Sequence, residues 1–309
     1  MTAIDAAFRR LRDAGEKGLV AYLTAGDPDP VSSLAYFRAA ADAGADILEV
    51  GVPFSDPTAD GPVIQAASQR ALKGGATLAK ILAMIAAFRR TSAIPIVLFG
   101  YYNPILSYGP DKFAADAAAS GIDGILVVDL PPEEAGELRR HTDKAGLAFI
   151  TLVAPTTDSP RVKKILRGAT GFVYYISVTG VTGTAAALPD DVRRDVERIK
   201  AMTPLPVAVG FGIATPAQAA AIAPLADGVV IGSALVRLIS EKGKSGDIIP
   251  AASAYAGGIR QAIDAARPGQ KSGGSISPGT SRSRSSLENP RQRPARLLPP
   301  IHRGRRGER

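Results

Sequence analysis

The chain has 309 residues, among them 37 Lys and Arg, 29 Asp and Glu, two His and no Cys or Trp. The absence of Cys excludes disulfides, Cys-ligated zinc, iron–sulfur clusters and a cysteine nucleophile, and two His leave little for an imidazole metal site. Acid–base chemistry therefore falls to carboxylates, Lys or Tyr. Apolar residues make up 46% of the chain, which is enough to bury a substantial core and excludes disorder throughout.

The formal net charge of +8 comes from one end of the chain. Residues 268–309 hold ten basic and two acidic residues, so the first 267 residues are electrically neutral. This C-terminal segment is rich in Ser, Gly, Pro and Arg, which predicts a disordered basic tail. An RNA-binding arm is the alternative, but no aromatic residues interleave with the arginines as single-strand binders require. We therefore expect a folded domain over 1–267 and a disordered tail over 268–309.

Strand and helix patterns alternate along the folded part, after a charged N-terminal stretch in which we expect one extra helix. Eight short apolar runs predict strands at 19–23, 47–50, 96–99, 124–128, 148–153, 172–176, 206–209 and 228–231. Helical patterns between them cover 31–43, 78–90, 111–119, 132–145, 189–202 and 216–222. The strict alternation predicts a parallel sheet.

Several strand runs are continuously apolar, as strands covered on both faces require. Eight strand–helix units in about 250 residues are typical of a closed barrel. No G-x-G-x-x-G follows the first run, which argues against an open dinucleotide-binding sheet. The sequence therefore predicts one (β/α)8 TIM barrel, a catalytic domain whose active site lies at the carboxyl ends of its strands.

A carboxylate stands inside the second apolar run. Glu49 is flanked by Leu48 and Val50, and a buried strand carboxylate is costly unless it is hydrogen-bonded, protonated or functional. The alternative, an edge position facing solvent, does not suit a barrel, which has no edge strands. The apolar surroundings should raise its pKa and suit it to proton transfer near neutrality.

The segment after this run is rich in Pro and Gly and predicts a shaped loop. It carries two further carboxylates, Asp56 and Asp60, each of which precedes Pro or Gly and has an ordinary turn-forming role as its alternative. Spacing alone does not choose between them. A second carboxylate at the same rim is what acid–base chemistry without His needs.

Glycine turns follow the last three predicted strands. Backbone N–H groups in such turns, together with a helix that begins beside Gly232 and Ser233, favour a phosphate site, although each turn alone is a common strand-to-helix connector. No Lys or Arg lies in these turns, which favours a monophosphate held by the backbone. The residues concerned are Thr182, Gly183, Gly212, Gly232 and Ser233.

These segments resemble the tryptophan synthase α chain family over most of the folded domain. The run Glu49-Val-Gly-Val-Pro-Phe-Ser-Asp-Pro57 is highly specific, and the order of the other segments also matches the family. Those segments are 22–28, 59–65, 101–105, 129–134, 153–157, 180–183 and 209–213. The chain departs from the family pattern at Val178, where an Arg is usual, and at Gly100, where Thr is common.

The resemblance implies a lyase of tryptophan biosynthesis that cleaves indole-3-glycerol phosphate to indole and glyceraldehyde 3-phosphate. It assigns catalysis to Glu49 and to Asp60 rather than Asp56. Glu49 would donate and then accept a proton, while Asp60 would face the indole N–H. The phosphate would rest on the glycine turns. Expected neighbours of the indole ring, each of which could equally be core packing, are Tyr22, Phe99, Leu126, Tyr174 and Phe211.

The resemblance also implies an α2β2 heterotetramer in which indole passes to a β chain that holds pyridoxal phosphate, with no cofactor in this chain. The loop over 53–60 and the helix after Tyr101 would contact that partner. We expect no nucleic-acid partner and no membrane span, since no segment has about 20 uninterrupted apolar residues, and the N-terminus lacks a signal-peptide run. The expected location is the cytoplasm.

Three other functions compete with this prediction. Ribulose-phosphate epimerases use metal-binding His, whereas His141 falls in a predicted helix, and indole-glycerol-phosphate synthases use strand-end Lys, which is absent here. A non-catalytic activator of a β chain would have no reason to keep Glu49 in an apolar strand. An RNA-binding protein conflicts with the neutral folded part.

Overall fold

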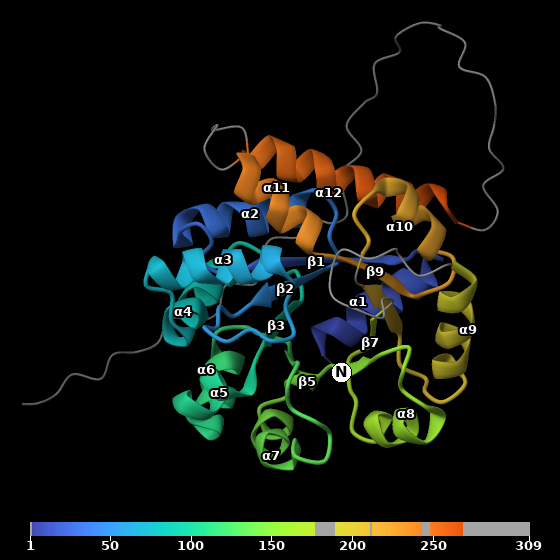
Figure 1. Cartoon of the computed structure of the whole chain (residues 1–309), viewed down its shortest axis with the longest axis horizontal. Coiled ribbons are helices and arrows are strands. Elements are labelled where there is room, and N and C mark those ends of the chain that lie inside the picture. Colours follow the sequence, from blue (N-terminus) through green and yellow to red (C-terminus); the bar gives the residue numbers. More distant parts are fainter. Residues whose placement is uncertain (1, 177–188, 211, 243–247, 268–309) are drawn as a thin grey trace, which may run out of the picture.

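The structure is a computed structural model that describes residues 2–176, 189–210, 212–242 and 248–267. The predicted tail over 268–309 and Val178 lie outside these residues. Within them, a parallel sheet forms the centre and helices surround it (Figure 1). The strands are β1 Gly18–Thr24, β2 Ile47–Gly51, β3 Ile96–Gly100, β4 Gly124–Val127, β5 Ala148–Phe149, β6 Thr151–Val153, β7 Val173–Ile176, β8 Val207–Gly210 and β9 Gly228–Ile231.

The sheet closes on itself. Its strand order is β5-β4-β3-β2-β1-β9-β8-β7-β6, and the two end strands are separated in the chain by Ile150 alone. The Ile150 N–H donates to the Ile125 carbonyl at 2.9 Å, which continues the ladder with β4, whereas β6 pairs with β7. The predicted TIM barrel is therefore confirmed. The single strand predicted at 148–153 is wrong in one respect: it divides at Ile150, because pairing passes there from one neighbour to the other.

Helices cover the outside of the barrel and one of its ends. They are α1 Ala3–Asp13, α2 Pro30–Asp42, α3 Pro62–Lys73, α4 Leu78–Arg89, α5 Tyr102–Tyr108, α6 Pro110–Ala119, α7 Gly136–Lys144, α8 Ser159–Leu166, α9 Pro189–Lys200, α10 Pro216–Ile222, α11 Ser233–Lys242 and α12 Ile248–Ala265. In the described parts of the chain no single helix is long and apolar enough to cross a membrane. Within the same described residues, the consecutive helices α3 and α4 meet the combined length and composition only when taken together, and they are bent by 95° at the break between them.

Local sequence sets where several helices begin. Asp158 accepts a hydrogen bond from the Arg161 N–H at 2.8 Å at the start of α8, and Thr215 and Gln218 form a reciprocal capping box at the start of α10. The predicted helix over 132–145 begins later, at Gly136. Residues 132–135 form turns first, and the N–H groups of Glu134 and Ala135 both donate to the Pro131 carbonyl.

Alternating side chains of each strand pack on the two faces of the barrel wall. In β1, Leu19 and Ala21 point outward to the helices, while Val20 and Tyr22 belong to a second apolar cluster inside the barrel. All seven residues of β1 are buried, so both faces are covered. This explains why the strand sequences are continuously apolar.

Helix α1 fills the amino-terminal end of the barrel and lies at the centre of the view (Figure 1). Its side chains Ile4 and Phe8 join the interior cluster, and the Phe8 ring lies 5.5 Å from that of Phe172. Gly124 lies so close to Ile4 that a Cβ there would be 2.9 Å from the Ile4 Cδ1 atom. The extra N-terminal helix is confirmed, and it closes the end opposite the strand carboxyl termini.

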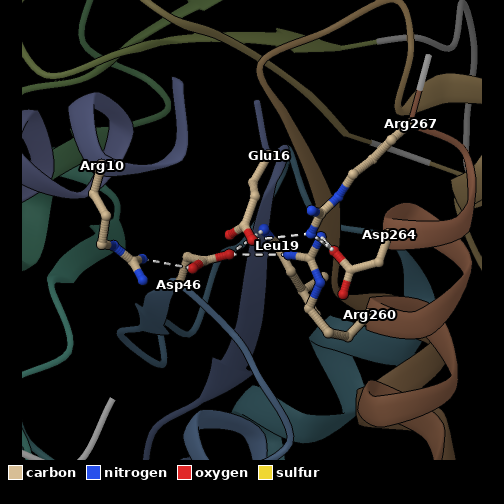
Figure 2. A network of polar contacts seen from close by, with 7 residues as sticks. All are labelled: Arg10, Glu16, Leu19, Asp46, Arg260, Asp264 and Arg267. Carbon is tan, nitrogen blue, oxygen red and sulfur yellow. Dashed lines mark hydrogen bonds and ion pairs between the residues drawn. The ribbon is translucent and has the colours of Figure 1, made fainter. Parts of the chain in front are cut away.

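A buried carboxylate holds α1, β1 and α12 together (Figure 2). Asp46 is 5% exposed and accepts hydrogen bonds from the Leu19 N–H at 3.0 Å, from Arg10 at 2.8 Å and from Arg260 at 3.0 Å. Arg260 is itself 6% exposed. Two guanidinium groups and one backbone donor therefore compensate for the burial of this charge.

The same network continues along α12 (Figure 2). Arg260 donates to Asp264 at 2.6 Å, and Asp264 also accepts from Arg267 at 2.9 Å. Arg267 reaches Glu16, in the turn before β1, at 3.0 Å. The charges alternate in sign from α1 to the end of α12, so the last helix is joined to the first part of the barrel.

We predict that Asp46→Asn lowers the free energy of unfolding by about 3 kcal/mol, because it removes the buried carboxylate that Arg10 and Arg260 share and leaves Asp264 to neutralise the buried Arg260. Asp13→Asn is the matched control, since Asp13 is exposed and 3.7 Å from Arg12; it should cost under about 1 kcal/mol. Urea unfolding of the three proteins measures both values. Equal losses in the two variants would show that the Asp46 network does not stabilise the fold.

Candidate active site

Glu49 lies inside the barrel, two residues before the end of β2. It pairs in register with Tyr22 of β1 and Val97 of β3, and the side chain of Val97 also belongs to the interior cluster. Glu49 is 1% exposed, and neither carboxyl oxygen has a hydrogen-bond partner among the described residues. Burial raises its pKa to about 8. The carboxyl group is therefore mostly protonated at neutral pH and able to donate a proton.

Asp60 lies in the loop between β2 and α3. The Gln65 side-chain amide donates to the Asp60 carbonyl oxygen at 2.8 Å, which holds the end of the loop against α3. Burial raises the pKa of the Asp60 carboxyl to about 6, and a hydrogen bond from Tyr101 opposes part of that rise. Asp60 is therefore mostly ionised at neutral pH, in contrast to Glu49.

The hydroxyl group of Tyr101 connects this loop to the strand next to β2. It accepts a hydrogen bond from the Ala59 N–H at 3.0 Å and bonds to the Asp60 carboxylate, while its ring packs 5.2 Å from that of Phe54. The sequence prediction did not include Tyr101 as a site residue. Its position directly after β3, at the carboxyl end of the barrel, is the signal that could have identified it.

The structure distinguishes the two loop carboxylates, between which the sequence spacing did not choose. Asp56 is exposed and accepts a hydrogen bond from the adjacent Ser55 hydroxyl at 2.5 Å, as in an ordinary turn. Asp60 is half-buried and bonded to Tyr101. Asp60, and not the exposed Asp56, is thus the loop carboxylate that is both partly buried and held by a residue after β3.

Large apolar and aromatic side chains surround Glu49 inside the barrel. Tyr22, Phe99, Leu126 and Tyr174 are all buried members of the interior cluster. The rings of Tyr22 and Phe99 meet edge to face with centroids 5.3 Å apart. These four predicted ring neighbours are therefore brought together, while Phe211 lies outside the described residues.

Two glycines make room for the tyrosine hydroxyl groups. A Cβ on Gly51 would overlap the Tyr22 hydroxyl, and a Cβ on Gly210 would overlap that of Tyr174. Both glycines end their strands, at the same end of the barrel. Any larger residue at either position would therefore require the tyrosine ring to move.

The predicted phosphate residues that the structure describes lie at the carboxyl ends of β8 and β9. Gly212 has a positive φ of 80°, which glycine adopts without strain. Gly232 follows β9 directly, and Ser233 begins α11, whose first N–H groups have no partner within the helix. Thr182 and Gly183 lie outside the described residues. A helix start and a glycine turn of this kind can bind a phosphate.

No group of three or more His, Asp or Glu side chains that could hold a metal ion occurs among the residues with described positions. His141 lies in α7, as predicted.

Comparison with known proteins shows the family. The family model described as "Tryptophan synthase alpha chain" matches residues 8–262. The chain belongs to the tryptophan synthase alpha chain family. The tryptophan synthase alpha chain of Geotalea daltonii is 53% identical over 237 residues, which cover 77% of this chain and 90% of that protein. The tryptophan synthase alpha chain of Geobacter sulfurreducens is 49% identical over 263 residues, which cover 85% of this chain and 99% of that protein.

Solved structures of the same family have the same fold. Tryptophan synthase subunit alpha from Legionella pneumophila str. Paris is 41% identical, with a TM-score of 0.80 over 85% of this chain and 99% of that one. A chain of Mycobacterium tuberculosis tryptophan synthase is 38% identical, with a TM-score of 0.77 over 86% of this chain and 98% of that one. Tryptophan synthase alpha chains are lyases that cleave indole-3-glycerol phosphate and work with a β chain.

The raised pKa of Glu49 predicts a pH dependence of stability. Because the pKa is about 8 in the folded chain and 4.5 ordinarily, the stability contribution of Glu49 is fully present below pH 4.5 and is lost as pH rises toward 8. Glu49→Gln, which cannot ionise, should therefore gain in thermal midpoint over the parent chain across this window. Exposed Glu134→Gln is the control and should show no such trend. If the thermal midpoints of the parent chain and of Glu49→Gln change in parallel with pH, Glu49 titrates as an ordinary carboxyl.

Proposed function

We propose that Glu49 and Asp60 carry out, in this chain, the retro-aldol cleavage of indole-3-glycerol phosphate to indole and glyceraldehyde 3-phosphate. The observation that carries this proposal is the contrast between two carboxyl groups at one end of the barrel. One is buried without a hydrogen-bond partner in the described part of the chain and has a pKa of about 8, and the other is bonded to Tyr101 and has a pKa of about 6. Pairs of carboxyls whose environments separate their pKa values supply an acid and an anion together.

Glu49 would act twice on the substrate. Its protonated carboxyl donates a proton to C3 of the indole ring, which makes that carbon able to leave. The C3–C3′ bond then breaks: its electron pair returns to the ring and neutralises the ring nitrogen, while the O–H electrons of the C3′ hydroxyl form the aldehyde. Glu49, now a carboxylate, accepts the hydroxyl proton and is regenerated.

Asp60 would stabilise the charge that develops between these steps. Protonation at C3 places positive charge on the ring nitrogen, and an ionised carboxylate facing the N–H lowers the energy of that state. The Tyr101 hydroxyl would keep Asp60 ionised and oriented, because it bonds to the carboxylate and also to the Ala59 N–H. The reaction requires only proton transfers and electrostatic stabilisation, so we propose that this chain works without a cofactor of its own.

The rest of the substrate would be held by groups around the two carboxyls. We propose that Tyr22, Phe99, Leu126 and Tyr174 contact the indole ring, since they form the apolar surroundings of Glu49. The phosphate would bind at the strand ends, to Gly212, Gly232 and Ser233 together with Thr182 and Gly183.

We propose that the partner is a pyridoxal-phosphate-dependent β chain in an α2β2 heterotetramer, which receives the indole. The loop over 53–60 and α5 are the surfaces expected to contact it. Leu106 of α5 is 51% exposed, and the N–H of Tyr102, the first residue of α5, bonds to Asp129 at 2.8 Å, which fixes the helix at the mouth of the barrel. An exposed leucine on a firmly held helix suits a protein contact.

We also propose that the catalytic domain covers 1–267 and that the basic segment 268–309 is separate from it. The family model ends at residue 262 and α12 ends at Ala265, so the tail follows directly after the part shared with the family.

We predict that Glu49→Gln lowers the rate of indole formation from indole-3-glycerol phosphate by roughly 10²-fold to 10⁴-fold, because the amide keeps the shape of the side chain but cannot exchange protons. The assay uses the chain with and without a β chain. Glu134→Gln, at an exposed position, is the control for the carboxylate-to-amide change. Turnover of Glu49→Gln at the level of Glu134→Gln would remove Glu49 from the mechanism.

For the phosphate site, we predict that Gly212→Asp weakens glycerol phosphate binding by roughly 100-fold or more, since it places a negative charge where the phosphate meets backbone N–H groups. Gly212→Ala is the matched variant: the positive φ strains both substitutions, so both should lower the thermal midpoint similarly. Titration of the folded proteins measures the affinities. If both variants bind glycerol phosphate like the parent chain, the phosphate lies elsewhere.

A further inference from the structure

A cavity of about 920 Å³ lies on the outside of the barrel and is lined by residues of α7, of α8 and of the segments that precede them. These two helices are consecutive around the barrel and lie at the bottom of the view (Figure 1). The floor of the cavity includes the outward-facing side chains Val127, Phe149 and Thr151 of β4, β5 and β6, and Ile165 of α8 contributes to the wall. This size lies in the range of small-molecule sites. The barrel mouth with Glu49 is not part of it.

The cavity coincides with the break in the sheet. β5 and β6 are the strands beneath it, and the chain between them bends at Ile150, which also lines the cavity. The two strands pair with different neighbours, β4 on one side and β7 on the other. The helices that follow β4 and β6 are therefore held to diverging parts of the barrel wall.

Four basic side chains line the cavity, against two acidic ones, Asp129 and Glu133. The basic residues are Arg139, Arg161, Lys164 and Arg167. Asp129 is engaged elsewhere, because it accepts the hydrogen bond from the Tyr102 N–H. The excess of cations is unusual for a chain whose folded part is electrically neutral.

Arg139 is held in a fixed position within this wall. Its guanidinium lies 5.1 Å from the centroid of the Phe149 ring and donates to the Gly168 carbonyl. A Cβ on Gly168 would overlap the guanidinium, so a larger residue there would require the Arg139 side chain to move. A cation placed over an aromatic floor combines charge with apolar surface, as binding sites for aromatic anions do.

One buried polar atom in the cavity lining lacks a partner. Thr151 is 8% exposed, and its Oγ1 atom has no hydrogen-bond partner among the described residues. A buried hydroxyl without a partner is costly and calls for an explanation such as a bound ligand. Thr151 lies on β6, directly after the break. It therefore adds an observation independent of the basic residues.

We propose that this cavity binds a small organic phosphate whose apolar or aromatic part lies on Phe149 and Ile165 and whose phosphate meets Arg161 and Lys164. A doubly charged anion suits a site with several cations better than a neutral ligand does. The Thr151 hydroxyl supplies a hydrogen bond at the floor. The site is distinct from the barrel mouth and does not depend on the proposed catalytic roles.

Glu133 occupies the same cations in the free protein. Its carboxylate pairs with Arg161 and lies 2.7 Å from Lys164. The ligand phosphate would replace this carboxylate, so Glu133 is an internal competitor. Removing its charge should therefore tighten ligand binding, whereas a purely structural ion pair would have no such effect.

The test is a titration of the full chain with phenyl phosphate. Binding is monitored by NMR through the backbone amide resonances of Thr151 and Ile165. The backbone amide resonance of Gly232, directly after β9, reports separately on binding at the barrel mouth. Arg161→Gln with Lys164→Gln should weaken binding about tenfold or more, and Glu133→Gln should tighten it severalfold. Arg194→Gln, on the exposed face of α9, is the charge control and should change nothing. Thr151→Val, nearly equal in shape, should weaken binding severalfold.

Benzyl alcohol and inorganic phosphate separate the apolar and anionic parts of the ligand. The proposal expects both to bind more weakly than phenyl phosphate. It is overturned if the Thr151 and Ile165 resonances do not respond to phenyl phosphate, if benzyl alcohol binds equally well, or if the double variant binds like the Arg194→Gln control.

Discussion

The site depends on one constraint: a carboxyl group is held inside a closed barrel with no hydrogen-bond partner among the residues that the structure describes. Burying an ionised carboxylate in this way costs so much that the group stays protonated instead. The closed sheet supplies that environment, because every strand turns apolar side chains toward Glu49, and α1 fills the opposite end of the barrel. The raised pKa of Glu49 is thus a property of the whole fold.

The loop between β2 and α3 provides the opposite environment for the second carboxyl. Asp60 is only half-buried and bonds to Tyr101, so its pKa rises less than that of Glu49. At neutral pH one group is an acid and the other an anion, although both lie at the same end of the barrel. The division of roles follows from burial and from one hydroxyl group, with no need for histidine.

Much of this could be predicted from the sequence, since strand positions and Glu49 depend on local patterns. An acidic residue between Leu48 and Val50 is visible without a structure. The contact of Tyr101 with the loop that carries Asp60 could not be predicted, because Tyr101 and Ala59 are 42 residues apart in the sequence. The contact of Asp46 with Arg260 spans 214 residues. The break at Ile150 depends on which strands lie on either side, which a continuous apolar run over 148–153 does not reveal.

The central claim is that Glu49 is protonated at neutral pH, and its carboxyl carbon reports this directly. Carbon-13 labelling of Glu side chains, with the Glu49 resonance assigned by its absence in Glu49→Gln, allows the group to be titrated by NMR in the full chain. The account predicts a midpoint near 8. A midpoint near the ordinary value of 4.5 would show that Glu49 is ionised at neutral pH and cannot be the proton donor.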